Sequence, residues 1–223
     1  MTSHIIIVGA DKGGVGKTTT SRALLAYLKG KNIDTRAFDT EYPIGVLKRF
    51  YPDTTDIVDL TSSDGQMTVF DNVAKASTTV IDIRAGLLSP SLQVLGEIGL
   101  LEGVKDGRYR MTLLHIIGAS IASFREIEAT KLASAGARHM LVMNHLNSSS
   151  FFEWKKDVRD VMAGNDGVIE IPRLDELAME HIDQLGVPFP DYVADEAQSM
   201  VLRGKTRHWM QAVYSQFDRT LGL

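Results

Sequence analysis

The stretch Asp11-Lys12-Gly13-Gly14-Val15-Gly16-Lys17-Thr18-Thr19 decides the fold. It follows residues 5–8, a continuous β-branched run that predicts a buried parallel strand. It precedes residues 18–29, where apolar residues at helical spacing predict a helix that stops at Gly30. A glycine-rich loop between a strand and a helix is the context in which such loops bind phosphate.

The residue types in this loop suit a nucleoside triphosphate with Mg²⁺. Glycines lack Cβ, so the backbone can curl and aim N–H groups inward, and the helix N-terminus adds partial positive charge. Lys17 is expected to neutralise the β- and γ-phosphates, Thr18 to ligate Mg²⁺ and Thr19 to reach the α-phosphate. The other predicted contacts come from Gly13, Gly14, Val15 and Gly16. The alternative is a glycine-rich turn that binds nothing.

Outside the loop, short apolar runs alternate with helical patterns. Strands are predicted at residues 35–39, 79–83, 111–117, 139–143 and 168–171, and helices at 121–132, 152–162, 174–185 and 203–221. This alternation predicts an α/β fold in three layers: a doubly wound, mostly parallel sheet with helices on both faces. The polar stretch 52–66 is expected to be a loop and not a domain boundary, so that residues 1–223 form a single domain.

Composition excludes several classes of protein. The chain has no cysteine, which excludes a disulfide framework and an iron–sulfur site and is compatible with the cytoplasm, where we expect the protein. A net charge of −4 does not indicate a globally basic nucleic-acid binder. No stretch approaches the roughly 18–20 apolar residues that a membrane span needs.

The loop departs from the strict pattern G-x-x-x-x-G-K-[ST], because Asp11 stands at the first glycine position. Its order Lys-Gly-Gly-Val-Gly-Lys-Thr-Thr resembles the ParA/MinD family of deviant-Walker ATPases, whose loop carries a second lysine ahead of the glycines. In that family this lysine reaches the phosphates bound by the partner subunit. The resemblance implies ATP and Mg²⁺ as cofactors, slow ATP hydrolysis stimulated by an activating protein, an ATP-dependent homodimer, and a catalytic role in trans for Lys12 beside Lys17.

Acidic residues at two strand ends complete the predicted site. The family usually shows Asp-x-Asp-Pro after the second strand, and the resemblance implies that Asp39 lies near the metal and that Glu41 orients the attacking water. Glu41 is one methylene longer than the usual acid and the proline is displaced to Pro43, so slow hydrolysis is expected. The apolar run that ends at Asp82 is typical of a Walker B strand, whose acid holds a Mg²⁺-bound water.

Four other positions are also candidates for the site or its surroundings. The resemblance implies that Asn144 hydrogen-bonds adenine and that Pro172 lays backbone against the base, but both residues are also common in turns. Gly86 is a candidate hinge, and Arg84, unusual for the family, has no single predicted contact: an acid, a phosphate or a dimer interface. The six histidines show no close metal-ligand spacing and are interpreted as structural.

The C-terminal segment carries a basic bias from Arg203, Lys205, Arg207, His208 and Arg219. Apolar residues at fours there predict a core-facing stripe: Trp209, Val213, Phe217 and Leu221. ParA-like proteins use basic surface near this end to hold non-specific DNA, which makes DNA a candidate partner. The alternative is a solvated helix face.

Three functions fit these observations. The first is a ParA-like ATPase that acts as an ATP-dependent dimerisation switch in the partition or positioning of plasmid, chromosome or protein cargo. The second is an ATP-dependent biosynthetic enzyme that resembles dethiobiotin or cobyrinic-acid amide synthases; such an enzyme needs a substrate pocket with dedicated polar groups. The third, suggested by Glu41 and Arg84, is a nucleotide-binding regulator with very slow hydrolysis.

Overall fold

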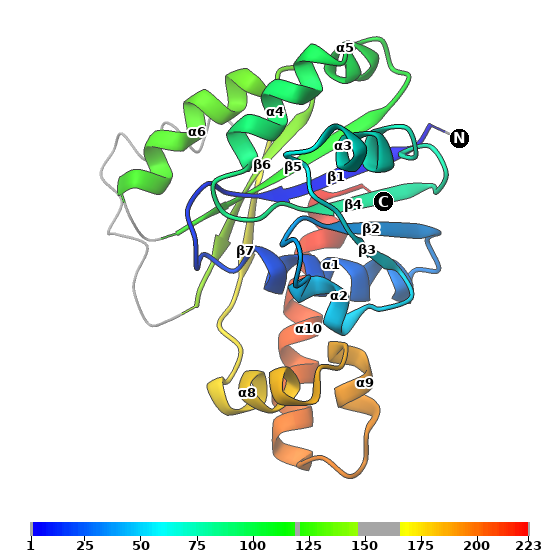
Figure 1. Cartoon of the computed structure of the whole chain (residues 1–223). Coiled ribbons are helices and arrows are strands. Elements are labelled where there is room, and N and C mark those ends of the chain that lie inside the picture. Colours follow the sequence, from blue (N-terminus) through cyan, green and yellow to red (C-terminus); the bar gives the residue numbers. More distant parts are fainter. Residues whose placement is uncertain (1, 119–120, 147–165, 223) are drawn as a thin grey trace.

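The structure is a computed structural model of the chain, and it describes residues 2–118, 121–146 and 166–222. Within these residues, seven strands form one sheet in the order β3-β2-β4-β1-β5-β6-β7 (Figure 1). All neighbouring strands pair in parallel, which confirms the predicted doubly wound α/β fold. The strands are β1 His4–Gly9, β2 Thr35–Asp39, β3 Thr55–Ile57, β4 Thr78–Asp82, β5 Arg110–Ile117, β6 Arg138–Asn144 and β7 Val168–Ile171.

Helices cover both faces of the sheet. One face carries α1 Lys17–Gly30, α2 Val46–Phe50, α8 Glu176–Leu185, α9 Phe189–Ala194 and α10 Met200–Thr220. The other carries α3 Ser63–Phe70, α4 Leu88–Glu97, α5 Leu100–Lys105 and α6 Ile121–Ala133 (Figure 1). None of the helices among the described residues is long and apolar enough to cross a bilayer.

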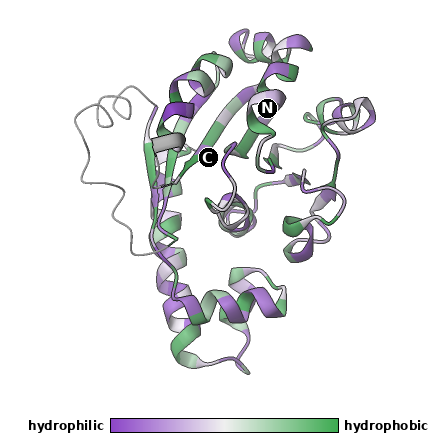
Figure 2. Cartoon of the chain, turned by 60° about the vertical axis from the view of Figure 1, so that its left-hand side comes forward, coloured by the Kyte–Doolittle hydropathy of each residue, from purple (hydrophilic) through white to green (hydrophobic). Residues whose placement is uncertain are grey.

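The core follows from the alternation of side chains along each strand. In β1, Ile6 and Val8 pack into the apolar cluster beneath α1 and α10, whereas Ile5 and Ile7 pack into the cluster beneath α4 and α5. The ribbon coloured by hydropathy in Figure 2 shows apolar residues gathered along the strands between the two helical layers. A sheet that is buried on both faces fixes the strand ends, and with them the loops that follow.

Helix α10 confirms the predicted core-facing stripe. Trp209, Val213, Phe217 and Leu221 are all buried, and Trp209 Nε1 donates to the backbone oxygen of Pro172 at 2.6 Å. Some basic residues of this helix contact other side chains or backbone, and others are exposed to solvent. Arg203 donates to the Val193 backbone oxygen and Lys205 pairs with Asp175, whereas Arg207 and His208 are exposed.

The interpretation of residues 52–66 as a loop was wrong. The stretch contains β3, and α3 begins at Ser63 with Ser62 accepting from the Gly65 N–H. Strand β3 lies at the sheet edge, where Asp56 points to solvent and pairs with Arg36 of β2 at 2.8 Å, so no apolar run reveals it. Helices α2, α4, α5 and α9 were not predicted. The predicted helix at 152–162 lies outside the described residues.

Three histidines are buried, in agreement with a structural role. His4 lies 2.9 Å from the Thr112 hydroxyl, and the rings of His115 and His139 stack with centroids 5.3 Å apart. Burial, and then the charge of His115, lower the pKa of His139 to about 4, which favours its neutral form. No group of three metal-ligating side chains occurs in the part of the chain that the structure describes.

Candidate nucleotide-binding site

The glycine-rich loop lies where the winding of the sheet reverses. It leaves the carboxyl end of β1 at Gly9 and enters α1 at Lys17. Strand β1 has β4 on one side and β5 on the other. Strands β2 to β4 lie on one side of β1 and strands β5 to β7 lie on the other, so the direction of winding reverses at β1. Open parallel sheets bind ligands at such switch points, outside the carboxyl ends of the strands. The topology therefore brings the acids that end β2 and β4 to the same edge as the loop.

The loop backbone depends on two glycines in the left-handed region, Gly14 with φ 70° and Gly16 with φ 88°. Gly16 is the N-cap of α1 and offers no side-chain acceptor, so the first N–H groups of that helix remain available to an anion. Lys17 is buried, and its Nζ donates to the backbone oxygen of Lys12 at 2.9 Å. The loop thus folds over its own lysine and exposes backbone donors.

Burial lowers the pKa of Lys17, and the charges of four acids oppose that shift: Asp82, Glu41, Asp11 and Glu126. A buried ammonium gains most from an anionic partner, because solvent does not compete for it. This lysine is therefore poised for a phosphate group.

Asp82 is the acid best suited to a metal. It is buried, its Oδ1 has no hydrogen-bond partner among the described residues, and the side chain of Thr18 lies beside its carboxyl group. Burial, then the charge of Asp39, raise its pKa to about 7. A cation would stabilise its charged form. The residues fit Mg²⁺, which would be held by Thr18 and, through water, by Asp82, with phosphates as further ligands, and would supply positive charge at the phosphates.

Replacing Asp82 with asparagine is expected to stabilise the nucleotide-free protein and weaken Mg²⁺-dependent nucleotide binding. The folded-state pKa of about 7 lies above the ordinary 3.8. Wild-type protein therefore loses stability relative to Asp82→Asn as pH rises between these values, and the difference stays constant above them. Because each pKa unit corresponds to about 1.4 kcal/mol, at pH 8 we expect a gain of up to about 4 kcal/mol, or about 8–16 °C in melting temperature. Melting curves at pH 5 and pH 8 check this, and an equal difference at both pH values would contradict it.

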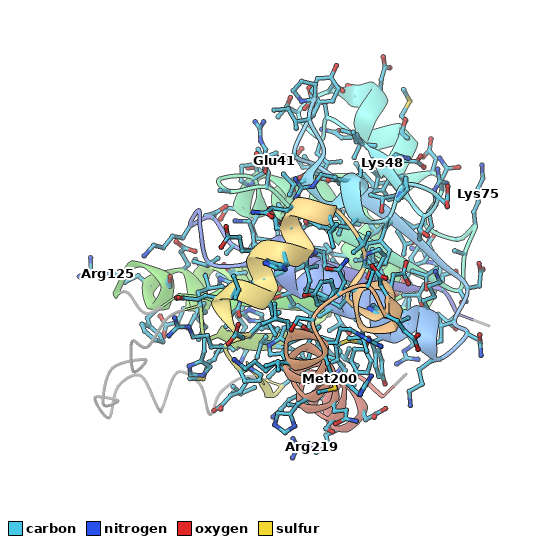
Figure 3. The ribbon with its side chains drawn as sticks, turned by 90° about the horizontal axis from the view of Figure 1, so that it is seen from below. Glu41, Lys48, Lys75, Arg125, Met200 and Arg219 are labelled. Carbon is cyan, nitrogen blue, oxygen red and sulfur yellow. The ribbon has the colours of Figure 1, made fainter. Side chains whose placement is uncertain are left out.

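Asp39 lies near Asp82, but its carboxylate is already occupied by backbone donors. Oδ1 accepts from the Glu41 N–H at 2.9 Å, and Oδ2 accepts from the N–H groups of Leu47 at 2.6 Å and Lys48 at 3.1 Å. Asp39 therefore fixes the turn that leads into α2. Glu41, in that turn, is exposed (Figure 3).

Two residues of the site were not predicted. Thr40 joins the ends of β2 and β4, because its hydroxyl donates to the backbone oxygen of Asp82 at 3.1 Å and accepts from the Arg84 N–H at 2.8 Å. No local pattern around Thr40 predicts this contact, because its partners lie 42 and 44 residues away along the chain. Asp11, noted only as a departure from the glycine pattern, accepts hydrogen bonds from the start of α4.

A cavity of about 350 Å³ lies beside the loop. Asn144 and Pro172 both line it, together with Thr19 of α1, Trp209 and three acids of α8, which are Glu176, Glu180 and Asp183. The Asn144 Nδ2 donates to the backbone oxygens of Val15 at 3.2 Å and Gly16 at 3.3 Å. A Cβ on Gly16 would lie 1.9 Å from this nitrogen. Asn144 therefore braces the loop as well as lining the cavity.

Comparison with known proteins yields structural matches only. No family model matches the sequence, and the search of curated proteins found no match. The chain is similar to septum site-determining protein MinD from Pyrococcus horikoshii, complexed with Mg-ADP, with 19% identity, a TM-score of 0.58 and coverage of 100% of this chain and 98% of that one.

Two further solved structures are similar. One is a putative plasmid partition protein from Borrelia burgdorferi bound to AMPPNP, with 14% identity, a TM-score of 0.52 and coverage of 98% and 99%. The other is the MinC:MinD cell division complex from Aquifex aeolicus, with 14% identity, a TM-score of 0.51 and coverage of 94% and 96%.

The chain therefore has the three-layer fold of the P-loop nucleoside triphosphatases. More narrowly, its fold is the one shared by MinD and the ParA-like plasmid partition proteins, and the resemblance indicated by the loop is confirmed at the level of fold.

Proposed function

We propose that this protein is a ParA/MinD-like ATPase that binds Mg-ATP and switches between a monomer and an ATP-dependent homodimer. The observation that carries this proposal is the tandem of Lys12 and Lys17 in one glycine-rich loop at the switch point of a MinD-like fold. Lys17 is buried beneath the loop, whereas Lys12 directly precedes Gly13 and Gly14, which are exposed to solvent. A lysine at that border suits a contact with a facing subunit.

We propose a separate role for each group of residues in the site. The backbone of residues 13–16 and the start of α1 bind the phosphates, and Lys17 neutralises them. Thr18 and Asp82 would hold Mg²⁺. Asn144 and Pro172 border a cavity beside the loop, which we assign to the base. Lys12 of the facing subunit adds positive charge as the transferred phosphoryl group develops negative charge.

Partners follow from the same proposal. The complex of MinC with MinD shows that a protein of this fold assembles with another protein. We infer that a protein activator stimulates hydrolysis and reopens the dimer. Arg207 and His208 are exposed on α10, and they are the residues of the basic segment that we assign to non-specific DNA.

The direct test is the molar mass of the purified protein by size exclusion with light scattering. We expect a monomer with Mg-ADP and a mass twice as large with Mg-AMPPNP. DNA binding is measured on the AMPPNP form at low and moderate salt, where affinity for DNA should fall steeply with salt. An unchanged mass in both nucleotides would overturn the switch, and no retention of DNA at low salt would remove DNA from the proposal.

A second candidate is a nucleotide-dependent switch that hydrolyses ATP very slowly. It is favoured by Asp39, whose two oxygens already accept from three backbone N–H groups, and by the exposure of Glu41. Neither acid is then held ready to orient water. Single-turnover hydrolysis, measured with and without a candidate activator, separates the two candidates, because a regulator of this kind would remain slow in both.

A further inference from the structure

The carboxylate of Asp11 caps helix α4 from outside that helix. Its Oδ1 accepts hydrogen bonds from the backbone N–H groups of Leu88 at 2.9 Å and Ser89 at 3.3 Å, and its Oδ2 accepts from the Ser89 hydroxyl. Leu87, the residue that precedes α4, supplies no side-chain acceptor for them. The first turn of a helix leaves N–H groups unpaired, and a carboxylate placed there stabilises the helix.

The backbone of the loop is attached to the same segment. The Gly86 N–H donates to the backbone oxygen of Asp11 at 2.9 Å. A Cβ on Gly13 would lie in ordinary contact, 3.7 Å from the Cβ of Ala85. Residues 11–13 of the loop therefore run along residues 85–89, the segment that connects Asp82 to α4. This segment includes Gly86, which is exposed and has φ 79°.

An acid in a loop that receives a polyanion has an electrostatic cost. Asp11 is among the acids whose charges act on Lys17, so its charge also lies within reach of a bound phosphate group. A neutral Ser or Asn can cap a helix about as well as Asp. The capping contacts to α4 offset the charge of Asp11, but only while α4 stays in place against the loop.

We propose that Asp11 is a positioning residue that couples occupancy of the phosphate loop to the start of helix α4. Phosphates in the loop hold its backbone, and with it Asp11, in the capping position. The capped α4 in turn holds the loop in the form that binds phosphate. This proposal rests on the proposed nucleotide binding and adds the path by which the segment after Asp82 responds to it.

Such coupling acts equally in both directions, so the effect of nucleotide on α4 and the effect of the cap on nucleotide binding can be compared as numbers. If nucleotide stabilises the start of α4 by a given factor, loss of the cap weakens nucleotide binding by the same factor. We therefore measure both quantities. Hydrogen–deuterium exchange of peptides covering residues 10–20 and 84–92 is followed with and without Mg-AMPPNP, and the dissociation constant of AMPPNP is measured by calorimetry.

In the wild-type protein we expect AMPPNP to slow exchange in both segments, by about tenfold at Leu88 and Ser89. In Asp11→Ala we expect residues 10–20 to remain protected at saturating AMPPNP while residues 84–92 no longer respond. The dissociation constant of Asp11→Ala should exceed that of Asp11→Asn, which lacks the same charge but keeps the acceptor, by the same factor, about tenfold. Asp11→Asn keeps an acceptor for both N–H groups and is expected to retain the response of residues 84–92.

Ser62→Ala is the matched control, because it removes the side-chain cap of α3 at a distance in sequence from the loop. It should leave both AMPPNP responses intact. Protection of residues 10–20 without any wild-type response at 84–92 overturns the coupling while nucleotide binding stands. The role of the cap is overturned if residues 84–92 of Asp11→Ala still respond to AMPPNP as in the wild type. It is also overturned if Asp11→Asn loses this response as completely as Asp11→Ala does. If AMPPNP protects neither segment, the proposed nucleotide binding itself fails.

Discussion

Replacing Lys17 with alanine should raise the dissociation constant of Mg-ATP at least about 100-fold, equivalent to about 3 kcal/mol. The ammonium is buried in the loop, where its charge is poorly solvated in the absence of a phosphate. Its removal leaves the bound triphosphate without its nearest cation. Isothermal titration calorimetry with Mg-ATP and Mg-ADP measures the loss.

The same substitution should leave the fold intact. Burial already disfavours the charged form of Lys17, so alanine removes an unfavourable charge along with one hydrogen bond to the Lys12 oxygen. We expect the melting temperature without nucleotide to stay within about 3 °C of the wild type. Lys29→Ala, at an exposed position on the same helix, is the control and should bind nucleotide normally. Wild-type affinity in Lys17→Ala would rule out the loop as the phosphate site.

Replacing Lys12 with alanine should abolish the ATP-dependent dimer while nucleotide binding by the monomer persists. Loss of a charge that contacts a triphosphate across a subunit interface costs about 2–5 kcal/mol, so the dimer dissociation constant should rise at least about 30-fold. Two such contacts occur in each symmetric dimer, which increases the effect. The affinity of the monomer for ADP should change by less than about threefold, because Lys12 contributes its backbone oxygen to the loop and alanine keeps it.

Lys75→Ala is the matched control for Lys12→Ala, since Lys75 is exposed and lies at the edge of the molecule, away from Glu41 (Figure 3). It removes the same charge from the surface and should dimerise as the wild type does. Light scattering with AMPPNP measures the mass of both variants. A Lys12→Ala protein that dimerises with wild-type affinity would exclude the contact in trans and favour the biosynthetic or regulatory alternatives.

The sequence predicted those parts of the fold that local patterns encode. Residues 5–8 are continuously β-branched, and the glycines and Lys17 follow directly, so a strand, a loop and a helix were evident. Strand β3 was not predicted, because its three residues form a strand only through their pairing with the neighbouring strand β2. The role of Asp11 also escaped, since its partners lie 77 and 78 residues away along the chain. Contacts between distant loops leave no local pattern in the sequence.

The short polar strand β3 has a consequence for how copies of this protein can associate. It is three residues long, and its central Asp56 forms an ion pair with Arg36. An edge this short offers few unpaired backbone groups, and a charged side chain opposes the approach of another strand. Growth of a continuous intermolecular sheet from this side is therefore disfavoured. The dimer that we propose avoids this edge, because its contacts would form at the loop-bearing end of the sheet, where a bound nucleotide would control them.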